Sequence, residues 1–443
     1  MTDTPALESP ARTLSSAPNG DTRHLIIVVR ADPIVCGHST EARNLAESAI
    51  ASGFESVHII SYPIAQLENS GLPLKPLASL PPYSPGIHVH RPGPIGDYKV
   101  LDGRLLHGMA GKICDLLHQQ RGGHTLVMDL YLVPHGEVVL RAVDSFSNCG
   151  LSTNVTTIAE AVGSDITNVV NNAIESGDLG AAQLVLSNFL RHDVPVAVSE
   201  YTRQLIVENG GRVDQALGTN FAEALEARCG VSYPAINTQL YTSIAEQSQD
   251  IKSVLDNRGL AYDGYLMFLS RVVPAKGVDD LIDAYKRSNF YGQKKLVIAG
   301  VGPAWDAMIA RAGGDKNILF FNDVSDAEKG YLMHATSAYV FPSKPRTEFT
   351  ETFGIAVAEK MLAGGPGPVV TTQTGGIPEA TGHHCLEHEP GNVDDLVAKL
   401  NELESMSPEA RQNLVKSAQD YALQFDGKAI LNKLLAKAQA ATR

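Results

Sequence analysis

The sequence predicts an α/β protein with two Rossmann-like domains, and three observations support this fold class. The chain has 443 residues, which is too long for one typical hydrophobic core. Short, unbroken apolar runs such as residues 25–29 are typical of strands that are buried on both faces of a parallel sheet. Segments with helical periodicity alternate with these runs, as they do in consecutive β-α-β units.

Composition and charge limit the classes of function. The formal net charge of −13 disfavours a nucleic-acid-binding surface and attraction to anionic lipid, because both need clustered Lys and Arg. No run of about eighteen apolar residues occurs in the sequence, so no membrane span is expected. Residues 1–22 are polar and lack the apolar core of a secretory signal, and we predict a disordered tail there.

The cysteines indicate a reducing compartment. The five cysteines are widely separated and form no Cys-x-x-Cys pair, so the sequence predicts neither a zinc site nor a disulfide framework. The simplest interpretation is a cytoplasmic, reduced protein.

The predicted first domain covers residues 23–245 and begins with the strand at residues 25–29. A loop with Gly37 follows, then a helix that ends near Ala51 and a strand from residue 57. The loop lies at the carboxyl end of the first strand, where open α/β sheets bind ligands. Gly37 permits close backbone approach, and a plain capped helix start is an equally weighted alternative.

Polar side chains are expected at the same edge of this sheet. Further strands are predicted at residues 125–129, 155–160 and 196–199, and a helical insertion at residues 166–191. Because carboxyl ends of parallel strands share one edge, the side chains that follow them should lie close together. The candidates near these ends and in the first loop are His38, Thr40, Asp129, Tyr131, His135 and Glu160. A lone histidine is more often a satisfied structural group than a catalytic one.

The predicted second domain covers residues 246–425 and opens with a buried strand at residues 265–270. This strand ends at Arg271, and Lys276 follows five positions later. Arg offers a planar fork for phosphate oxygens, and Lys offers a compact charge. Taken alone, the pair is equally compatible with two exposed basic side chains.

The remaining strands of the second domain lead to a pair of glutamates. Runs at residues 296–299, 318–321 and 338–341 precede Gly300, Val324 and the segment from Glu351 to Glu359 respectively. Apolar spacing predicts a helix that begins near Gly354, with Phe353 before it and Ile355 inside it. A helix start offers free N–H groups and a positive dipole end, which suit a phosphate. The alternative, at about even odds, is an amphipathic helix with two solvated glutamates.

The stretch from Glu351 to Glu379 resembles the signature of nucleotide-sugar-dependent glycosyltransferases of the GT-B fold, specifically retaining family 4. It contains two glutamates with seven residues between them, Phe-Gly after the first, a Val-Val strand and a Gly-Gly-x-x-Glu segment. Arg271 and Lys276 match an Arg and a Lys-Gly of that family. The turn at residues 363–368 is about two residues longer than is usual in the family.

This resemblance implies two Rossmann-like domains with parallel sheets facing across a cleft, and a last helix at residues 426–443 that crosses back to the first domain. It implies that Arg271, Lys276 and Glu351 are catalytic: the two cations hold the donor diphosphate, and Glu351 orients the sugar. Glu359 would bind the ribose. The expected donor-binding set is Gly37, Arg271, Lys276, Gly300, Val324, Glu351, Phe353, Gly354, Ile355 and Glu359.

The resemblance also implies that no metal or other cofactor is needed. Three histidines at positions 383, 384 and 388 suggest a metal, but they lack the helical spacing of a zinc site, and we give that interpretation about one chance in ten.

The acceptor side departs from the family. Many members have a histidine after the Val-Thr strand, where this chain has Glu160, so Glu160 or His135 is expected to take its place. The first domain lacks a basic cluster, which favours a small soluble polar acceptor.

The predicted function is therefore retaining transfer of a hexose-type sugar from a UDP- or GDP-sugar, in natural-product or compatible-solute biosynthesis. The alternatives are a nucleotide-sugar epimerase or a phosphorylase on the same scaffold, a transferase acting on a lipid or polysaccharide, and a non-enzymatic nucleotide-sugar-binding regulator.

Overall fold

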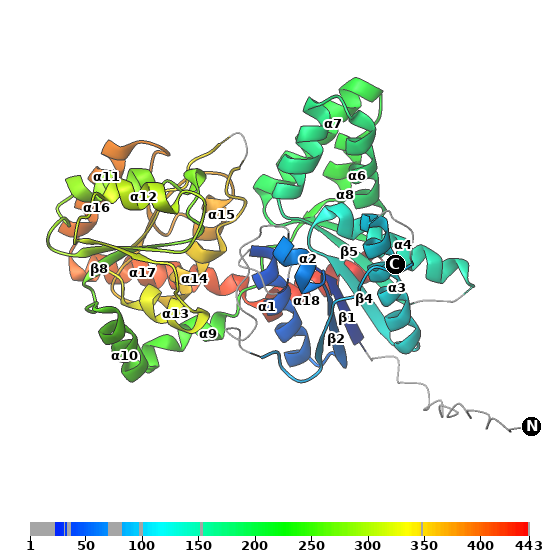
Figure 1. Cartoon of the computed structure of the whole chain (residues 1–443), viewed down its shortest axis with the longest axis horizontal. Coiled ribbons are helices and arrows are strands. Elements are labelled where there is room, and N and C mark those ends of the chain that lie inside the picture. The colour runs from blue at the N-terminus through cyan, green and yellow to red at the C-terminus, as the bar shows by residue number, and fades with distance from the viewer. Residues whose placement is uncertain are drawn as a thin grey trace, which may run out of the picture.

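The structure is a computed structural model that describes residues 23–30, 32, 37–69, 82–96, 101–150, 154–346 and 349–441. The tail predicted at residues 1–22 lies outside these residues. Two parallel sheets dominate the fold, and they form two lobes (Figure 1). The first is seven-stranded with the order β3-β2-β1-β4-β5-β6-β7, and the second is six-stranded with the order β10-β9-β8-β11-β12-β13.

The first lobe alternates strands and helices from residue 23 to residue 231. Its strands are β1 Arg23–Val28, β2 Ser56–Ile60, β3 Ile87–His90, β4 His124–Asp129, β5 Val155–Ala161, β6 Val194–Ala197 and β7 Gly230–Val231. Its helices are α1 Gly37–Ala51, α2 Ile64–Asn69, α3 Leu101–Gln119, α4 Glu137–Asn148, α5 Asn172–Glu175, α6 Leu179–Arg191, α7 Glu200–Leu217 and α8 Phe221–Arg228, with π-helical turns at Leu132–Gly136 and Ile166–Asn171.

The second lobe repeats the same alternation. Its strands are β8 Tyr265–Leu269, β9 Lys295–Ala299, β10 Ile318–Phe321, β11 Ala338–Phe341, β12 Val369–Thr372 and β13 Leu386–His388. The helices from the connecting segment onward are α9 Thr238–Thr242, α10 Ser248–Arg258, α11 Val278–Arg287, α12 Trp305–Ala312, α13 Asp326–Ala335, α14 Ile355–Ala363, α15 Ile377–Thr381, α16 Val393–Ser405, α17 Pro408–Ala422 and α18 Gly427–Ala441, with short 3-10 turns at Ile244–Glu246, Pro274–Lys276 and Leu423–Phe425.

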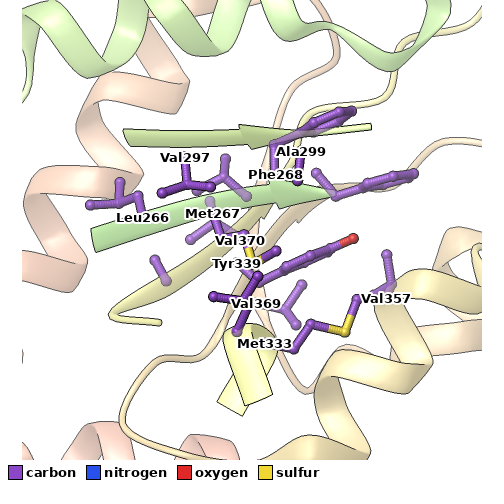
Figure 2. Close-up of a cluster of buried hydrophobic side chains, with 14 of the residues drawn as sticks. Leu266, Met267, Phe268, Val297, Ala299, Met333, Tyr339, Val357, Val369 and Val370 are labelled. Atoms are coloured by element: carbon purple, nitrogen blue, oxygen red, sulfur yellow. The ribbon is translucent and has the colours of Figure 1, made fainter. Parts of the chain in front are cut away.

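The core of the second lobe explains why its strands are continuous apolar runs. Helices cover both faces of the sheet, so neighbouring side chains such as Met267 and Phe268 are both fully buried although they point to opposite faces (Figure 2). Tyr339 is also buried, and its hydroxyl donates a hydrogen bond to the carbonyl of Leu269 at 2.8 Å. The sheet is therefore a rigid platform for the loops at its carboxyl edge.

The last helix returns to the first lobe. In Figure 1, α18 lies beside α1, and its side chains Ile430, Leu431 and Leu434 belong to the hydrophobic core of the first sheet. The predicted fold class is thereby confirmed: two Rossmann-like parallel sheets with a C-terminal helix that crosses back.

The predicted helical insertion at residues 166–191 is confirmed. The segment forms a π-helical turn, the short α5 and then α6, with Gly177 at a positive φ of 80° between the two helices.

No helix in the described part of the chain is both long and apolar enough to cross a membrane.

Candidate functional site

The predicted cations and the first glutamate meet at the carboxyl edge of the second sheet. Lys276 ends the turn after β8, and only 5% of its surface is exposed. Its Nζ forms an ion pair with Glu351, although 75 positions separate the two residues in sequence. The same Nζ lies 4.8 Å from the ring centre of Phe341 and 5.0 Å from that of Phe349.

Arg271 lies beside this pair. Its guanidinium carbon is 5.9 Å from the ring centre of Phe349, and the side chain is exposed. Burial lowers the pKa of Lys276, Glu351 raises it, and the nearby charge of Arg271 lowers it. Arg271 and the pair of Lys276 and Glu351 therefore form one electrostatic group in which Arg271 is the exposed cation.

The backbone explains why glycine follows Lys276. Gly277 has a φ of +67°, and a Cβ at this position would lie 2.0 Å from the carbonyl oxygen of Pro342. Only glycine allows this approach, which holds the lysine turn against the end of β11. Gly300 has the same kind of role: it has a φ of +131° and packs against the carbonyl oxygen of Ser270.

The start of α14 lies directly after Glu351. Gly354 takes a left-handed conformation, and the helix begins at Ile355. Its first N–H groups have no partners in their own helix, and the positive end of the helix dipole favours an anion. Phe353 is buried against Phe425 and Tyr233, at ring distances of 5.0 and 5.6 Å, so its backbone is the part that lies at the helix start.

Glu359 lies inside α14 and has protein partners. Its Oε1 accepts a hydrogen bond from Lys329 Nζ at 2.7 Å, and the hydroxyl of Tyr241 also bonds to the carboxylate. Lys329 and Tyr241 were not predicted from the sequence, because both lie on other helices, far from the motif. Val324 is half-buried in the loop after β10, next to the capping box that starts α13.

Loops of the first lobe approach this group. A Cβ added to Gly37, at the start of α1, would lie 3.3 Å from the side chain of Ile355. The Thr352 hydroxyl donates a hydrogen bond to the carbonyl of Val162 at 3.1 Å, and Gly163 leaves room for the Thr352 methyl group. Each of these contacts joins loops that follow the carboxyl ends of strands, so the two sheets meet by these edges.

His38 lies where the lobes meet. Burial first, and then the nearby charges of Arg30 and Arg271 with the ring of His135, lower its pKa to about 3. A neutral imidazole is therefore expected at physiological pH. Its ring lies 5.9 Å from that of Tyr131. Thr40 is half-buried in the first turn of α1.

The candidates at the ends of β4 and β5 separate into two groups. Asp129 has a protein partner, because Nε2 of the buried His192 lies 3.1 Å from its Oδ2. Glu160 and His135 are fully buried, and in the described part of the chain their side-chain polar atoms have no hydrogen-bond partner. Burial raises the pKa of Glu160, and the nearby carboxylates, Glu41 first, raise it further. The sequence analysis missed Glu41 and His192, for which no local pattern gives a signal.

Metal sites and surface hollows are the other kinds of binding site to consider in the described part of the chain. Among the described residues, no three His, Cys, Asp or Glu side chains are grouped as a metal site requires. Two surface hollows, of about 620 and 530 Å³, lie between α4 and α6 and at the start of α16, away from Lys276 and Glu351.

Comparison with known proteins agrees with this geometry. Residues 260–421, which lie in the second lobe, match the family model described as "Glycosyl transferases group 1". Over 94% of its length the chain has the GT-B fold, with two Rossmann-like lobes that meet at the carboxyl ends of their strands.

Two relatives with named activities match parts of this chain in sequence. An alignment over 182 residues, which covers 38% of this chain and about half, 46%, of the relative, is 27% identical to O-antigen chain mannosyltransferase B of Escherichia coli. A 104-residue segment, 23% of this chain, is 32% identical to D-rhamnosyltransferase WbpZ of Pseudomonas aeruginosa and spans 26% of it.

Solved structures cover more of the chain at lower identity. The Anabaena protein Alr3699/HepE, solved in complex with UDP and glucose, superposes with a TM-score of 0.64 at 19% identity, over 94% of this chain and 99% of that one. Sucrose-phosphate synthase from Thermosynechococcus elongatus gives a TM-score of 0.62 at 16% identity, over 95% of this chain and 100% of that one. These likenesses define the fold.

Proposed function

We propose that the chain is a retaining glycosyltransferase that transfers a hexose-type sugar from a UDP- or GDP-sugar. The observation that carries this proposal is the Lys276–Glu351 pair beside Arg271 at the start of α14, within a segment that matches the group 1 glycosyl transferases. Retention of the anomeric configuration follows the family that the two-glutamate motif resembles.

The donor diphosphate binds at the two cations and the helix start. Arg271 is exposed and receives the phosphates first, while Lys276 exchanges its contact with Glu351 for a phosphate oxygen. As the nucleoside diphosphate leaves, negative charge develops where these fixed donors point, and they stabilise the transition state electrostatically. Glu351, once freed from Lys276, accepts hydrogen bonds from the sugar hydroxyls and orients the ring.

The nucleoside lies along α14 and the neighbouring loops. Glu359 accepts hydrogen bonds from the ribose hydroxyls, and Lys329 holds this carboxylate in place. The loops at Gly300 and Val324 lie beside the base and phosphates, and Gly37 brings the backbone of the first lobe close to the start of α14. None of these steps requires a metal ion, and we propose a metal-independent reaction.

The acceptor binds on the first lobe. Asp129 and His192 form a fixed pair, and the neutral His38 lies near Arg271, where the donor phosphates are placed. The groups that an acceptor would contact are His38, Thr40, Asp129, Tyr131, His135 and Glu160. Because the first lobe lacks a basic cluster in its sequence, we propose a small soluble polar acceptor, in natural-product or compatible-solute biosynthesis. The reduced cysteines agree with a cytoplasmic enzyme.

A second acceptor class has its own support. The relatives named for the O-antigen chain and for rhamnosyl transfer favour a growing polysaccharide as the acceptor. The two classes are distinguished by supplying the same donor with small polyols and aminocyclitols in one set of reactions and with oligosaccharides in another.

The donor is tested first. Thermal unfolding is measured with a panel of UDP- and GDP-sugars, because a ligand that binds only the folded state raises the unfolding temperature. The stabilising donor is then used to follow release of the nucleoside diphosphate with each acceptor set, and NMR of the product reports the anomeric configuration. The proposal fails if no nucleotide sugar stabilises the protein.

A further inference from the structure

One carboxylate of the second lobe contacts the first lobe and takes no part in the proposed reaction. Glu379 lies in α15, after the carboxyl end of β12. Its Oε2 accepts a hydrogen bond from the backbone N–H of Glu200 at 2.7 Å, and its Oε1 accepts one from the N–H of Tyr201 at 2.9 Å. The Tyr233 hydroxyl also hydrogen-bonds to this carboxylate. All three donors precede the first strand of the second sheet.

The two backbone donors form the start of α7. The first N–H groups of a helix have no partners in their own helix, and the helix dipole favours negative charge there. The Ser199 side chain accepts the third, from Thr202, at 3.1 Å. Glu379 accepts the other two, so a charged residue of the second lobe completes the cap of a helix in the first lobe. Hydrogen bonds to an ionised group are stronger than neutral ones.

The segment that carries Glu379 is joined directly to the candidate donor site. The Gly376 N–H donates a hydrogen bond to the Glu351 carbonyl at 2.9 Å. A Cβ on Gly375 would lie 2.0 Å from that same carbonyl oxygen, so the two backbones are in contact. Thr352, next in sequence, donates to the Val162 carbonyl of the first lobe. The contact between the lobes and the loop of Glu351 are therefore one packed unit.

A different connection joins the lobes where the chain crosses between them. The N–H of Ile236 donates to the Phe425 carbonyl at 2.9 Å, and the N–H of Gly427 donates to the Ile236 carbonyl at 2.9 Å. The chain passes through this connection twice, so it stays intact when the lobes move apart. The Glu379 contact, in contrast, is made by a side chain and not by the chain crossing, so its hydrogen bonds can open.

We propose that Glu379 is a latch, that is, a positioning residue that holds the two lobes closed by capping α7. It acts through the loop of Glu351 and not by touching a substrate. The claim that this latch encloses a nucleotide-sugar site rests on the proposed function. The claim that Glu379 holds the two lobes together does not.

The first experiment needs no ligand. We compare the wild type with Glu379→Ala, Glu379→Gln and Tyr233→Phe, and with Glu402→Ala as a control, because Glu402 is a half-exposed carboxylate of the second lobe that pairs only with Lys399 on its own helix. Hydrogen exchange of the Glu200 and Tyr201 amides should be about tenfold faster in Glu379→Ala, since the loss of a charged hydrogen bond changes an opening equilibrium by about this factor. The radius of gyration from X-ray scattering should increase.

The graded variants separate a latch from a general folding defect. Glu379→Gln keeps an oxygen acceptor but loses the charge, and Tyr233→Phe removes one hydroxyl, so both should give smaller changes in the same direction. They also carry the test if Glu379→Ala does not fold. Unchanged exchange at Glu200 and Tyr201 in folded Glu379→Gln and Tyr233→Phe overturns the latch, as does an equal change in Glu402→Ala.

The second experiment adds UDP and GDP as probes. Whichever nucleotide binds the wild type should bind Glu379→Ala about tenfold more weakly, because the closed arrangement of the Glu351 loop is less populated. Equal affinity in the two proteins would overturn the coupling between the latch and the site. If the variant opens but neither nucleotide binds the wild type, the latch stands and the proposed function fails.

Discussion

At the scale of single residues, the important feature is a lysine whose surroundings differ from those of most lysines. Lys276 is buried, lies near two aromatic rings and has Glu351 as its counterion. Removing one partner from a buried ion pair leaves an uncompensated charge, and this is strongly destabilising. Loss of activity in a single variant therefore mixes a catalytic and a structural effect, and a test has to separate them.

A double variant makes this separation. Lys276→Met leaves Glu351 buried without its partner, and we expect the free energy of unfolding to fall by about 3 kcal/mol. Adding Glu351→Gln removes the unpaired charge and should restore most of the stability. Activity should stay about a hundredfold or more below that of the wild type in both variants, because the diphosphate loses a fixed cation. Urea unfolding and release of the nucleoside diphosphate measure the two quantities.

The matched control is Lys399→Met, which removes a partly exposed lysine that pairs with Glu402. Its stability should change by less than about 1 kcal/mol and its activity should not change. Near-wild-type release by Lys276→Met would contradict the assigned role.

A second prediction at this scale concerns metal ions. If the diphosphate charge is balanced by Arg271, Lys276 and the start of α14, treatment with EDTA should leave release of the nucleoside diphosphate unchanged within about twofold. A loss of activity that added Mg²⁺ or Mn²⁺ restores would show that a cation shares this charge.

At the scale of elements, β2 and β3 carry a group of histidines on one face. His58 Nδ1 lies 2.9 Å from His90 Nε2, and the rings of His58 and His88 stack at 5.2 Å. Burial first, and then the nearby histidines and Lys112, lower the pKa of His58 to about 3 and that of His90 to about 4. Both rings are therefore neutral at pH 7.

The sign of the resulting pH dependence follows from linkage. In the unfolded chain these histidines take up protons near pH 6.5, whereas in the folded protein they stay neutral until about pH 4 or below. The unfolded state binds more protons between these values, so stability is lost as the pH falls through this window. Because both rings are partly exposed, we expect about 1 kcal/mol between pH 7 and pH 5.

The corresponding measurement is urea unfolding at pH 7 and pH 5 for the wild type and for the double variant His58→Gln, His90→Gln. The loss of stability should be smaller in the variant. His383→Gln is the control, because His383 is exposed and belongs to the other lobe. An equal loss of stability in the wild type and the double variant would show that the histidines do not cause it.

The strands were predictable at this scale, and most side-chain partners were not. Apolar runs such as residues 265–269 identify strands buried on both faces, since no other short element requires that pattern. Lys276 and Glu351 were paired only through the family resemblance. His192 beside Asp129 and Lys329 beside Glu359 have no local signal, because such pairs depend on how distant helices pack.

At the scale of the whole molecule, α18, which follows the second lobe, completes the core of the first lobe. Leu434 of α18 is only 1% exposed and belongs to the core of the first sheet, more than 400 positions from where that sheet begins. Leu434→Ala should reduce the free energy of unfolding by about 3 kcal/mol, through lost burial and a cavity. Leu423→Ala, at a 45% exposed leucine of the same C-terminal region, should cause a change of less than about 1 kcal/mol.

Hydrogen exchange localises this effect. The amides of α1 and β6, which contact α18, should exchange faster in Leu434→Ala than those of β9 and β10 in the other lobe. A uniform change over both lobes would indicate that they unfold as a single unit.

The path of α18 also constrains the order of events during synthesis. The ribosome releases the strands of the first lobe early, yet part of their hydrophobic covering, Ile430, Leu431 and Leu434, emerges only after the whole second lobe. Until then the apolar surface of the nascent first lobe that these residues cover is exposed to water and to chaperones. A gene truncated between the lobes would encode a first lobe that lacks the hydrophobic side chains of α18. We therefore expect the two lobes to be encoded together.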